Sequence, residues 1–109
     1  MTRYLGVDLA WGEGTSARLA KETGVVCIDD EGSVLDAGWT RGIDATTDWI
    51  LQWARAGDMV AIDAPLVVTN AIGMRECERQ VGVRYGRWRV AANSTNLSRP
   101  WLGGVSLRQ

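Results

Sequence analysis

The chain has 109 residues, 46% of them apolar and 23% charged, and a formal net charge of −1. This length and composition suit a compact core, so we expect residues 1–109 to form a single domain. The sequence contains no histidine, which excludes a Ser-His-Asp triad, a Cys-His pair and imidazole-ligated zinc. Acid and metal chemistry must therefore rest on Asp and Glu.

No stretch of the sequence is apolar for long enough to cross a bilayer, and Met1 to Arg3 lead into the first predicted strand without a signal-peptide apolar region. We therefore expect a cytoplasmic protein without a membrane partner. Cys27 and Cys77 lie far apart in the sequence and have no metal-ligand spacing. We interpret them as small, buried, reduced residues in preference to a disulfide.

A carboxylate interrupts the first predicted strand, residues 4–11. Asp8 falls on the face with small neighbours, Gly6 and Ala10, which leave room for a ligand. A charge buried in such a strand needs hydrogen bonds, a counter-charge or a metal. The opposite face carries the large apolar side chains Leu5, Val7, Leu9 and Trp11.

A hairpin is predicted next. Residues 12–23 have no clear period and are expected to be a loop. Two apolar or alternating runs, residues 24–28 and 34–40, predict strands, and turn-forming residues at 29–33 separate them.

A helix follows the hairpin. Asp44 or Thr47 is expected to cap it, and Gly57 is placed where a helix normally stops. Its apolar stripe consists of Trp49, Ile50, Trp53 and Ala54. The helix returns the chain to a fourth strand at residues 59–63.

The fourth strand repeats the pattern of the first, since it ends in Asp63 just before Pro65. A hairpin followed by a helical crossover places this strand parallel to the first one. We therefore predict an α/β fold with a mixed sheet, in the order strand-strand-strand-helix-strand-helix, with Asp8 and Asp63 side by side.

The last predicted helix covers residues 71–82, with Asn70 as its cap. Met74, Cys77 and Val81 are expected to face the core, whereas Arg75, Glu78 and Arg79 are expected to face away. From Gly82 onward the chain is rich in arginine and mostly irregular. Pro100 and the Gly103-Gly104 pair argue against a long final element.

Paired strand-end carboxylates without histidine or thiolate ligands form a hard-oxygen site, which suits Mg²⁺ or Mn²⁺. Two such ions about 4 Å apart can activate water and stabilise the leaving oxygen in phosphodiester hydrolysis. The alternative is that Asp8 and Asp63 cap neighbouring turns.

Several short motifs together resemble the domain of unknown function 429 family, whose members are described as predicted RNase H-like nucleases. The resemblance covers about residues 4–104 and implies an RNase H-like core with acidic metal ligands at Asp8 and Asp63. Family members are longer, so the chain resembles the N-terminal portion of that domain. The motifs are Gly6-Val7-Asp8-Leu9-Ala10, Ile62-Asp63-Ala64-Pro65-Leu66, Asn70, Arg75-Glu76-Cys77-Glu78, Tyr85-Gly86-Arg87, Ala92-Asn93 and Thr95-Asn96.

A third metal ligand could come from Asp44 or Asp48 on the first helix or from Glu78 on the second. A helix cap for the former and a surface ion pair between Arg75 and Glu78 are the alternatives that we favour.

The two halves of the chain differ in charge. Residues 1–63 contain 11 acidic and 5 basic side chains, whereas residues 64–109 contain 2 acidic and 7 basic ones. Interleaved arginines and aromatic residues in the second half are typical of contact with a polyanion, and a solvated face that neutralises the acidic half is the alternative. The candidate substrate-binding residues are Arg75, Glu78, Arg87, Arg89, Asn93 and Asn96, with Arg87 and Arg89 on one face of an extended segment.

The asparagines among these candidates could equally form turns. Trp88 and Trp101 could stack on bases, although we favour core positions for these large rings.

Three functions remain open. The first is a Mg²⁺- or Mn²⁺-dependent nuclease that uses Asp8 and Asp63 as catalytic metal ligands and acts on nucleic acid. The second is a phosphotransferase of the actin-like or sugar-kinase type, although Gly12 and Gly14 are a poor substitute for its phosphate-binding hairpin. The third is a non-catalytic module that forms a homo-oligomer or uses a partner chain to complete its sheet.

Overall fold

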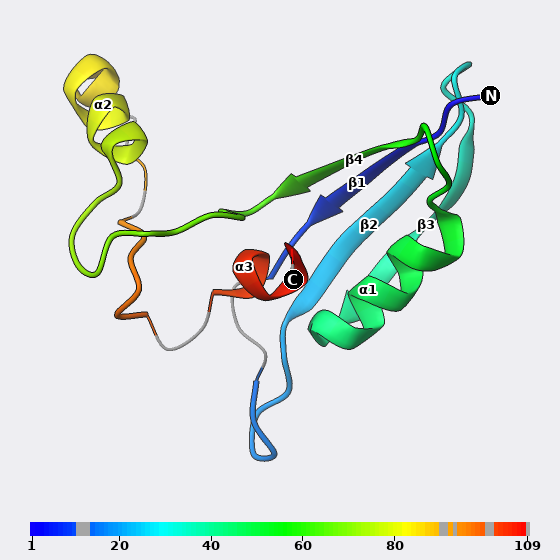
Figure 1. Cartoon of the computed structure of the whole chain (residues 1–109), viewed down its shortest axis with the longest axis horizontal. Coiled ribbons are helices and arrows are strands. Elements are labelled where there is room, and N and C mark those ends of the chain that lie inside the picture. The colour runs from blue at the N-terminus through cyan, green and yellow to red at the C-terminus, as the bar shows by residue number, and fades with distance from the viewer. Residues whose placement is uncertain (11–13, 90–91, 93, 100–101, 109) are drawn as a thin grey trace.

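The computed structural model describes residues 1–10, 14–89, 92, 94–99 and 102–108. It is an α/β structure with a four-stranded mixed sheet, as predicted (Figure 1). Its elements are β1 (Tyr4–Asp8), β2 (Glu22–Ile28), β3 (Val34–Arg41), α1 (Gly42–Trp53), β4 (Met59–Asp63), α2 (Glu76–Tyr85), the 3₁₀ helix η1 (Gly86–Trp88) and α3 (Gly103–Arg108).

The sheet has the strand order β3-β2-β1-β4. β1 is antiparallel to β2 and parallel to β4, and β2 and β3 form the predicted hairpin. β2 begins two residues earlier than expected, at Glu22. The reason is visible at Thr23, which is buried and whose hydroxyl accepts a hydrogen bond of 3.0 Å from the backbone N–H of Ala10.

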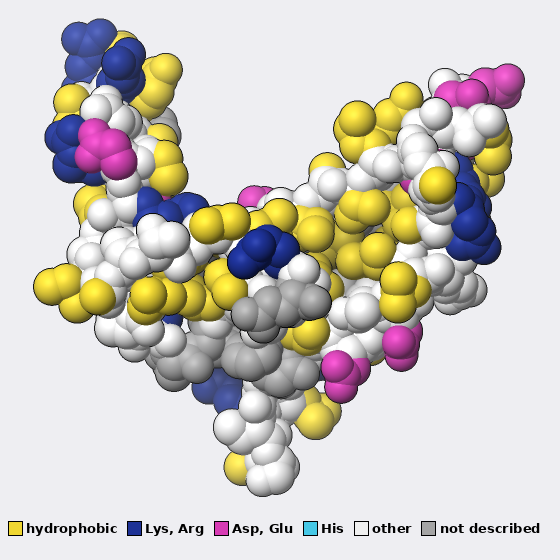
Figure 2. Space-filling view, in the orientation of Figure 1, with side chains coloured by type: hydrophobic (Ala, Val, Ile, Leu, Met, Phe, Trp, Pro, Cys, Tyr) yellow, Lys and Arg dark blue, Asp and Glu magenta, His cyan; other side chains and the backbone are white. Residues whose placement is uncertain are grey.

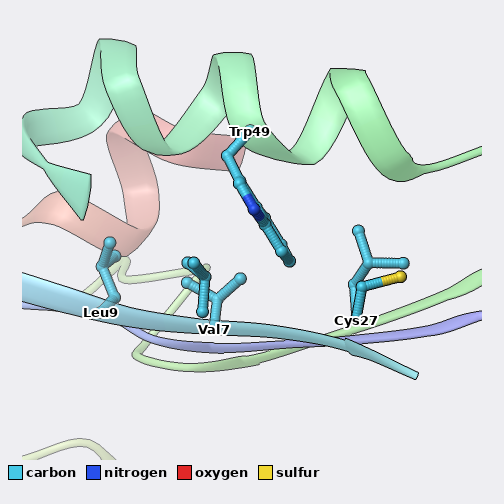
Figure 3. Close-up of a cluster of buried hydrophobic side chains, with 6 residues drawn as sticks. Val7, Leu9, Cys27 and Trp49 are labelled. Carbon is cyan, nitrogen blue, oxygen red and sulfur yellow. The ribbon is translucent and has the colours of Figure 1, made fainter. Parts of the chain in front are cut away.

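The core lies between the sheet and α1 (Figure 3). Leu5, Val7 and Leu9 project from one face of the β1 segment, as their alternation predicts, and are buried. Trp49 of α1 points down onto them, and its indole N–H donates to Asp36 Oδ2 over 2.8 Å. Each such apolar side chain stabilises the fold by roughly 1.5–3 kcal/mol relative to an exposed one. The predicted partner Trp11 lies outside the described residues.

The helix α1 carries the predicted apolar stripe but begins earlier than predicted. Neither Asp44 nor Thr47 caps it, because β3 runs directly into α1 at Gly42 without a linker. Gly42 has φ +84°, a conformation that favours glycine and allows this abrupt turn. The hydroxyl of the fully buried Thr46 donates a hydrogen bond of 2.8 Å to the Gly42 carbonyl and so stabilises the turn between β3 and α1.

None of the described helices lies on the other face of the sheet. We call this surface the open face and define it by the outward-facing residues of three rows across the strands. They are Asp63, Asp8, Gly24 and Trp39, then Ala61, Gly6, Val26 and Ala37, then Met59 and Tyr4. The edge strand β4 is consequently more exposed than its apolar sequence suggests, with Met59 exposed on this side.

The helix α2 differs most from the prediction. It begins at Glu76 rather than after Asn70, and it stands clear of the sheet (Figure 1). With no sheet beneath it, Met74 and Cys77 are exposed, whereas Glu78 is buried by contacts described below. The predicted core positions of Met74 and Cys77 and the outward position of Glu78 were therefore wrong, whereas Arg79 is exposed, as predicted.

Both cysteines are free, as predicted, but only Cys27 is buried.

The final helix α3 is short, in agreement with the two glycines at its start. Leu107 of α3 packs against the core, and the backbone of Gly104 lies so close to Pro65 that a Cβ atom there would be 2.2 Å from the Pro65 carbonyl oxygen. Within the described chain, no helix has the length and apolar character needed to cross a bilayer.

Candidate functional site

Asp8 and Asp63 are direct register partners on the adjacent parallel strands β1 and β4. Neighbouring strands are about 4.8 Å apart, and register partners of a parallel pair project from the same face. The predicted adjacency is therefore confirmed. Both side chains are exposed at the C-terminal ends of their strands, on the open face.

The start of the two strands sets this register. The Asp58 carboxylate accepts hydrogen bonds from the backbone N–H and from Nε of Arg3, over 2.9 and 3.1 Å. In return, the Met59 N–H donates to the Arg3 carbonyl over 3.0 Å. Hydrogen bonds from Arg3 and Arg55 lower the pKa of Asp58, so this carboxylate holds the strands together as an anion. These contacts between Arg3 and residues 58–59 fix the register at one end of the strands, so Asp8 lies beside Asp63 at the other end.

Two hollows meet at the paired carboxylates. One, of about 470 Å³, is lined by Asp8, Asp63 and Arg75 together with apolar residues just after β1, at the end of β4 and in the segment after β4. The other, of about 860 Å³, extends from the same two aspartates across the open face to Trp39. The site thus combines two anionic groups, one guanidinium and an apolar floor.

The carboxylates of the two aspartates have no hydrogen-bond or ion-pair partner within the described residues. Like charges directly opposite each other on neighbouring strands repel, so the arrangement favours a bound cation. Two exposed carboxylates fit Mg²⁺ or Mn²⁺, because such ions commonly take one or two carboxylates and complete their shell with water or phosphate oxygens. Among the described residues, no group of three or more potential ligands gathers at one place.

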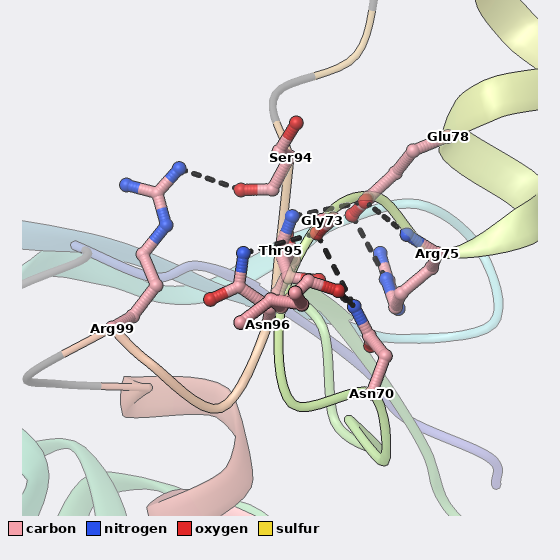
Figure 4. Close-up of polar contacts among 9 residues, drawn as sticks. Asn70, Gly73, Arg75, Glu78, Ser94, Thr95, Asn96 and Arg99 are labelled. Carbon is pink, nitrogen blue, oxygen red and sulfur yellow. Dashed lines mark hydrogen bonds and ion pairs between the residues drawn. The ribbon is translucent and has the colours of Figure 1, made fainter.

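None of the proposed third ligands joins the pair. Asp44 and Asp48 lie on α1, which packs against the face of the sheet opposite to Asp8. Glu78 is occupied elsewhere, in the polar cluster at the base of α2 (Figure 4). We therefore assign Asp8 and Asp63 alone as candidate ligands.

Glu78 holds the base of α2 together. Its side chain is 4% exposed and accepts hydrogen bonds from Nε of Arg75 (2.8 Å) and from the backbone N–H groups of Arg75 and Thr95 (both 2.9 Å). Burial alone would raise its pKa, but the hydrogen bonds from Thr95 and Arg75 outweigh that effect and lower the pKa to about 2. The Arg75–Glu78 pair was predicted correctly, but its placement at the surface was wrong.

The asparagines of this region also hold the backbone. Nδ2 of Asn96 donates to the Gly73 carbonyl over 3.0 Å, and Oδ1 of Asn96 accepts from the Ser98 N–H over 3.1 Å. Nδ2 of Asn70 donates to the Thr95 carbonyl over 2.9 Å. These contacts favour the turn-forming interpretation of Asn96, whereas Asn93 lies outside the described residues.

We call α2 and η1, residues 76–88, the arm. Figure 2 shows basic side chains gathered on this projection, and Figure 1 shows it on the side toward which β1 and β4 point. The guanidinium of Arg87 lies 3.9 Å from the centre of the Trp88 ring, and Trp88 is 58% exposed. The core position favoured for Trp88 was therefore wrong, and Trp101 lies outside the described residues.

The expected extended segment with Arg87 and Arg89 on one face was also wrong. Arg87 lies within η1, and Arg89 ends that turn with a left-handed backbone at φ +62°. Both arginines are exposed, Arg87 within the arm and Arg89 directly after it. The sequence analysis did not single out Trp39, which is exposed on β3 in the same row as Asp8. The alternation of side chains along this strand could have indicated that Trp39 lies on the same face of the sheet as Asp8.

None of the protein-family models, curated proteins or solved structures compared with this chain matches it. The function of the site must therefore be inferred from the paired carboxylates, the shared hollow and the basic arm.

Proposed function

We propose that this protein is a Mg²⁺- or Mn²⁺-dependent phosphodiesterase that acts on nucleic acid in the cytoplasm, with an RNase H-like sheet at its centre. The observation that carries the proposal is the direct register of Asp8 and Asp63 on adjacent parallel strands. The resemblance of the motifs around these residues to the domain of unknown function 429 family supports it.

In this proposal, Asp8 and Asp63 hold the metal. A divalent ion between them would offset their repulsion and would supply the means to activate water and to stabilise the leaving oxygen. Arg75 lines the same hollow and is 27% exposed, so its guanidinium can contact a phosphate while Nε remains bound to Glu78. The arginines of the arm would contact the flanking backbone phosphates.

The test is divalent binding, followed by cleavage. Calorimetry with Mg²⁺ and Mn²⁺ should detect binding to the wild-type chain and not to the Asp8→Asn/Asp63→Asn variant, whereas Asp30→Asn, in the exposed hairpin turn, is the matched control. Single- and double-stranded DNA and RNA should then be cleaved by the wild type and the control only. Equal metal binding by all three proteins would refute the assignment.

A non-catalytic binding module is the second candidate, because the described residues provide two potential metal ligands at this place and no third. Salt-sensitive binding of nucleic acid without cleavage in either metal would favour it. The phosphotransferase alternative predicts tight ATP binding instead, which the same calorimetry measures.

A further inference from the structure

Within the described part of the chain, the arm and the open face are two surfaces that no other element covers, and their shapes and charges are complementary. The middle row of the open face consists of Val26 and three small residues, Ala61, Gly6 and Ala37, and lines a trough across the four strands. Asp8, Asp63 and Trp39 border one side of it. The trough is about 14 Å long, from three inter-strand spacings of about 4.8 Å. A ten-residue helix such as α2 is about 15 Å long.

The arm carries a matching apolar stripe. Val81, Tyr85 and Trp88 recur at helical spacing, and the rings of Tyr85 and Trp88 are 6.3 Å apart between centroids. Tyr85 and Trp88 are exposed. Arg84 and Arg87 flank this stripe, and within the described chain neither of them takes part in an ion pair.

The base of the arm prevents it from folding back onto its own sheet. Glu78 ties the first turn of α2 to Thr95, and hydrogen bonds from Asn70 to Thr95 and from Asn96 to Gly73 tie the segment before α2 to residues 95 and 96. Rotating the arm over its own open face would break these contacts, of which the one between Glu78 and Thr95 is buried and the one between Asn70 and Thr95 is half-buried, and such contacts are costly to leave unmade. The surface that the arm can cover therefore belongs to another molecule.

We propose that two copies of this chain associate by mutual exchange of arms, with the stripe of each arm in the trough of the other copy and Arg84 and Arg87 beside Asp8 and Asp63. Two contacts, each of one short helix in a trough of the same length, make a small interface near the lower limit of about 1,200 Å² for specific association. The dimer should therefore be weak and sensitive to salt. Because the docked arm covers the two aspartates, the dimer is a closed state that metal or nucleic acid would oppose.

The experiment is sedimentation equilibrium without divalent ions or nucleic acid, with a reductant so that the exposed Cys77 forms no disulfide. The apparent mass should rise with concentration from 11.9 kDa toward twice that value. Trp88→Ala/Arg84→Glu on the arm and Ala37→Glu in the trough should each weaken association about tenfold or more. Val83→Ser, exposed on the opposite side of α2, is the matched control.

Mixing separates mutual exchange from other modes of association. The arm variant keeps an intact trough and the trough variant keeps an intact arm, so a mixture should associate more strongly than either variant alone, through one intact contact. A wild-type mass of 11.9 kDa at all concentrations, a mixture that associates no more strongly than either variant alone, or association unchanged by the arm variant would each overturn the proposal. Since no metal or substrate is present, this outcome is independent of the test of the phosphodiesterase.

Discussion

Replacing Glu78 with Gln should release the base of the arm without disturbing the core. At neutral pH, Glu78 is an anion that accepts three hydrogen bonds in a buried position. Gln preserves the shape of the side chain but removes the charge that Arg75 neutralises. Because α2 stands clear of the sheet, the loss should appear as local opening of α2 and of its contacts with residues 94–97 rather than as global unfolding.

The magnitude follows from the pKa. The pKa of Glu78 is about 2 in the folded protein against an ordinary value of 4.5, a difference that corresponds to about 3 kcal/mol. A lowered pKa means that this stability is fully present above about pH 4.5 and is lost as the pH falls toward 2. Glu78→Gln should therefore lose about 2–3 kcal/mol of protection against opening at pH 7.

Hydrogen exchange of the amides of α2 and Thr95, measured between pH 2 and 7, gives this opening free energy across the range in which Glu78 takes up its proton. The matched control is Glu76→Gln, because hydrogen bonds from Arg79 and Gln80 also lower the pKa of Glu76 to about 2. However, the Glu76 side chain is 67% exposed, so solvent screens the interaction and the control should change little. Equal protection in both variants, or an unchanged pH dependence in Glu78→Gln, would refute the role given to burial.

Two further changes test the packing around the sheet. Gly104→Ala places a methyl group against the Pro65 carbonyl, so α3 should detach and the melting temperature should fall, whereas Gly38→Ala, where a Cβ meets no neighbour, should have little effect. An unchanged melting temperature for Gly104→Ala would contradict the close approach. A thiol reagent should modify only Cys77 in the folded protein, because Cys27 is buried and desolvation raises the pKa of its thiol. Rapid modification of both thiols without denaturant would contradict the burial of Cys27.

Local patterns were enough to predict the sheet. The alternation of Leu5, Val7 and Leu9 specifies which side of β1 is buried, because successive side chains of a strand point to opposite faces. The hairpin and the helical crossover then leave few ways to arrange the strands, and the parallel pairing of β1 with β4 follows from the handedness and length of such connections. The juxtaposition of Asp8 and Asp63 could be predicted for the same reason.

The sequence did not predict the position of the second helix or its polar base. A 3.6-residue period marks a side chain as apolar or polar but does not identify the surface that it meets, and α2 meets no sheet. Glu78 is buried because the backbone N–H of Thr95, seventeen residues away, approaches it in space. Likewise, the open face of the sheet became apparent only when α1 was seen to cover the opposite one. Contacts between distant segments decide these features, because burial depends on the whole arrangement of the chain rather than on its local pattern.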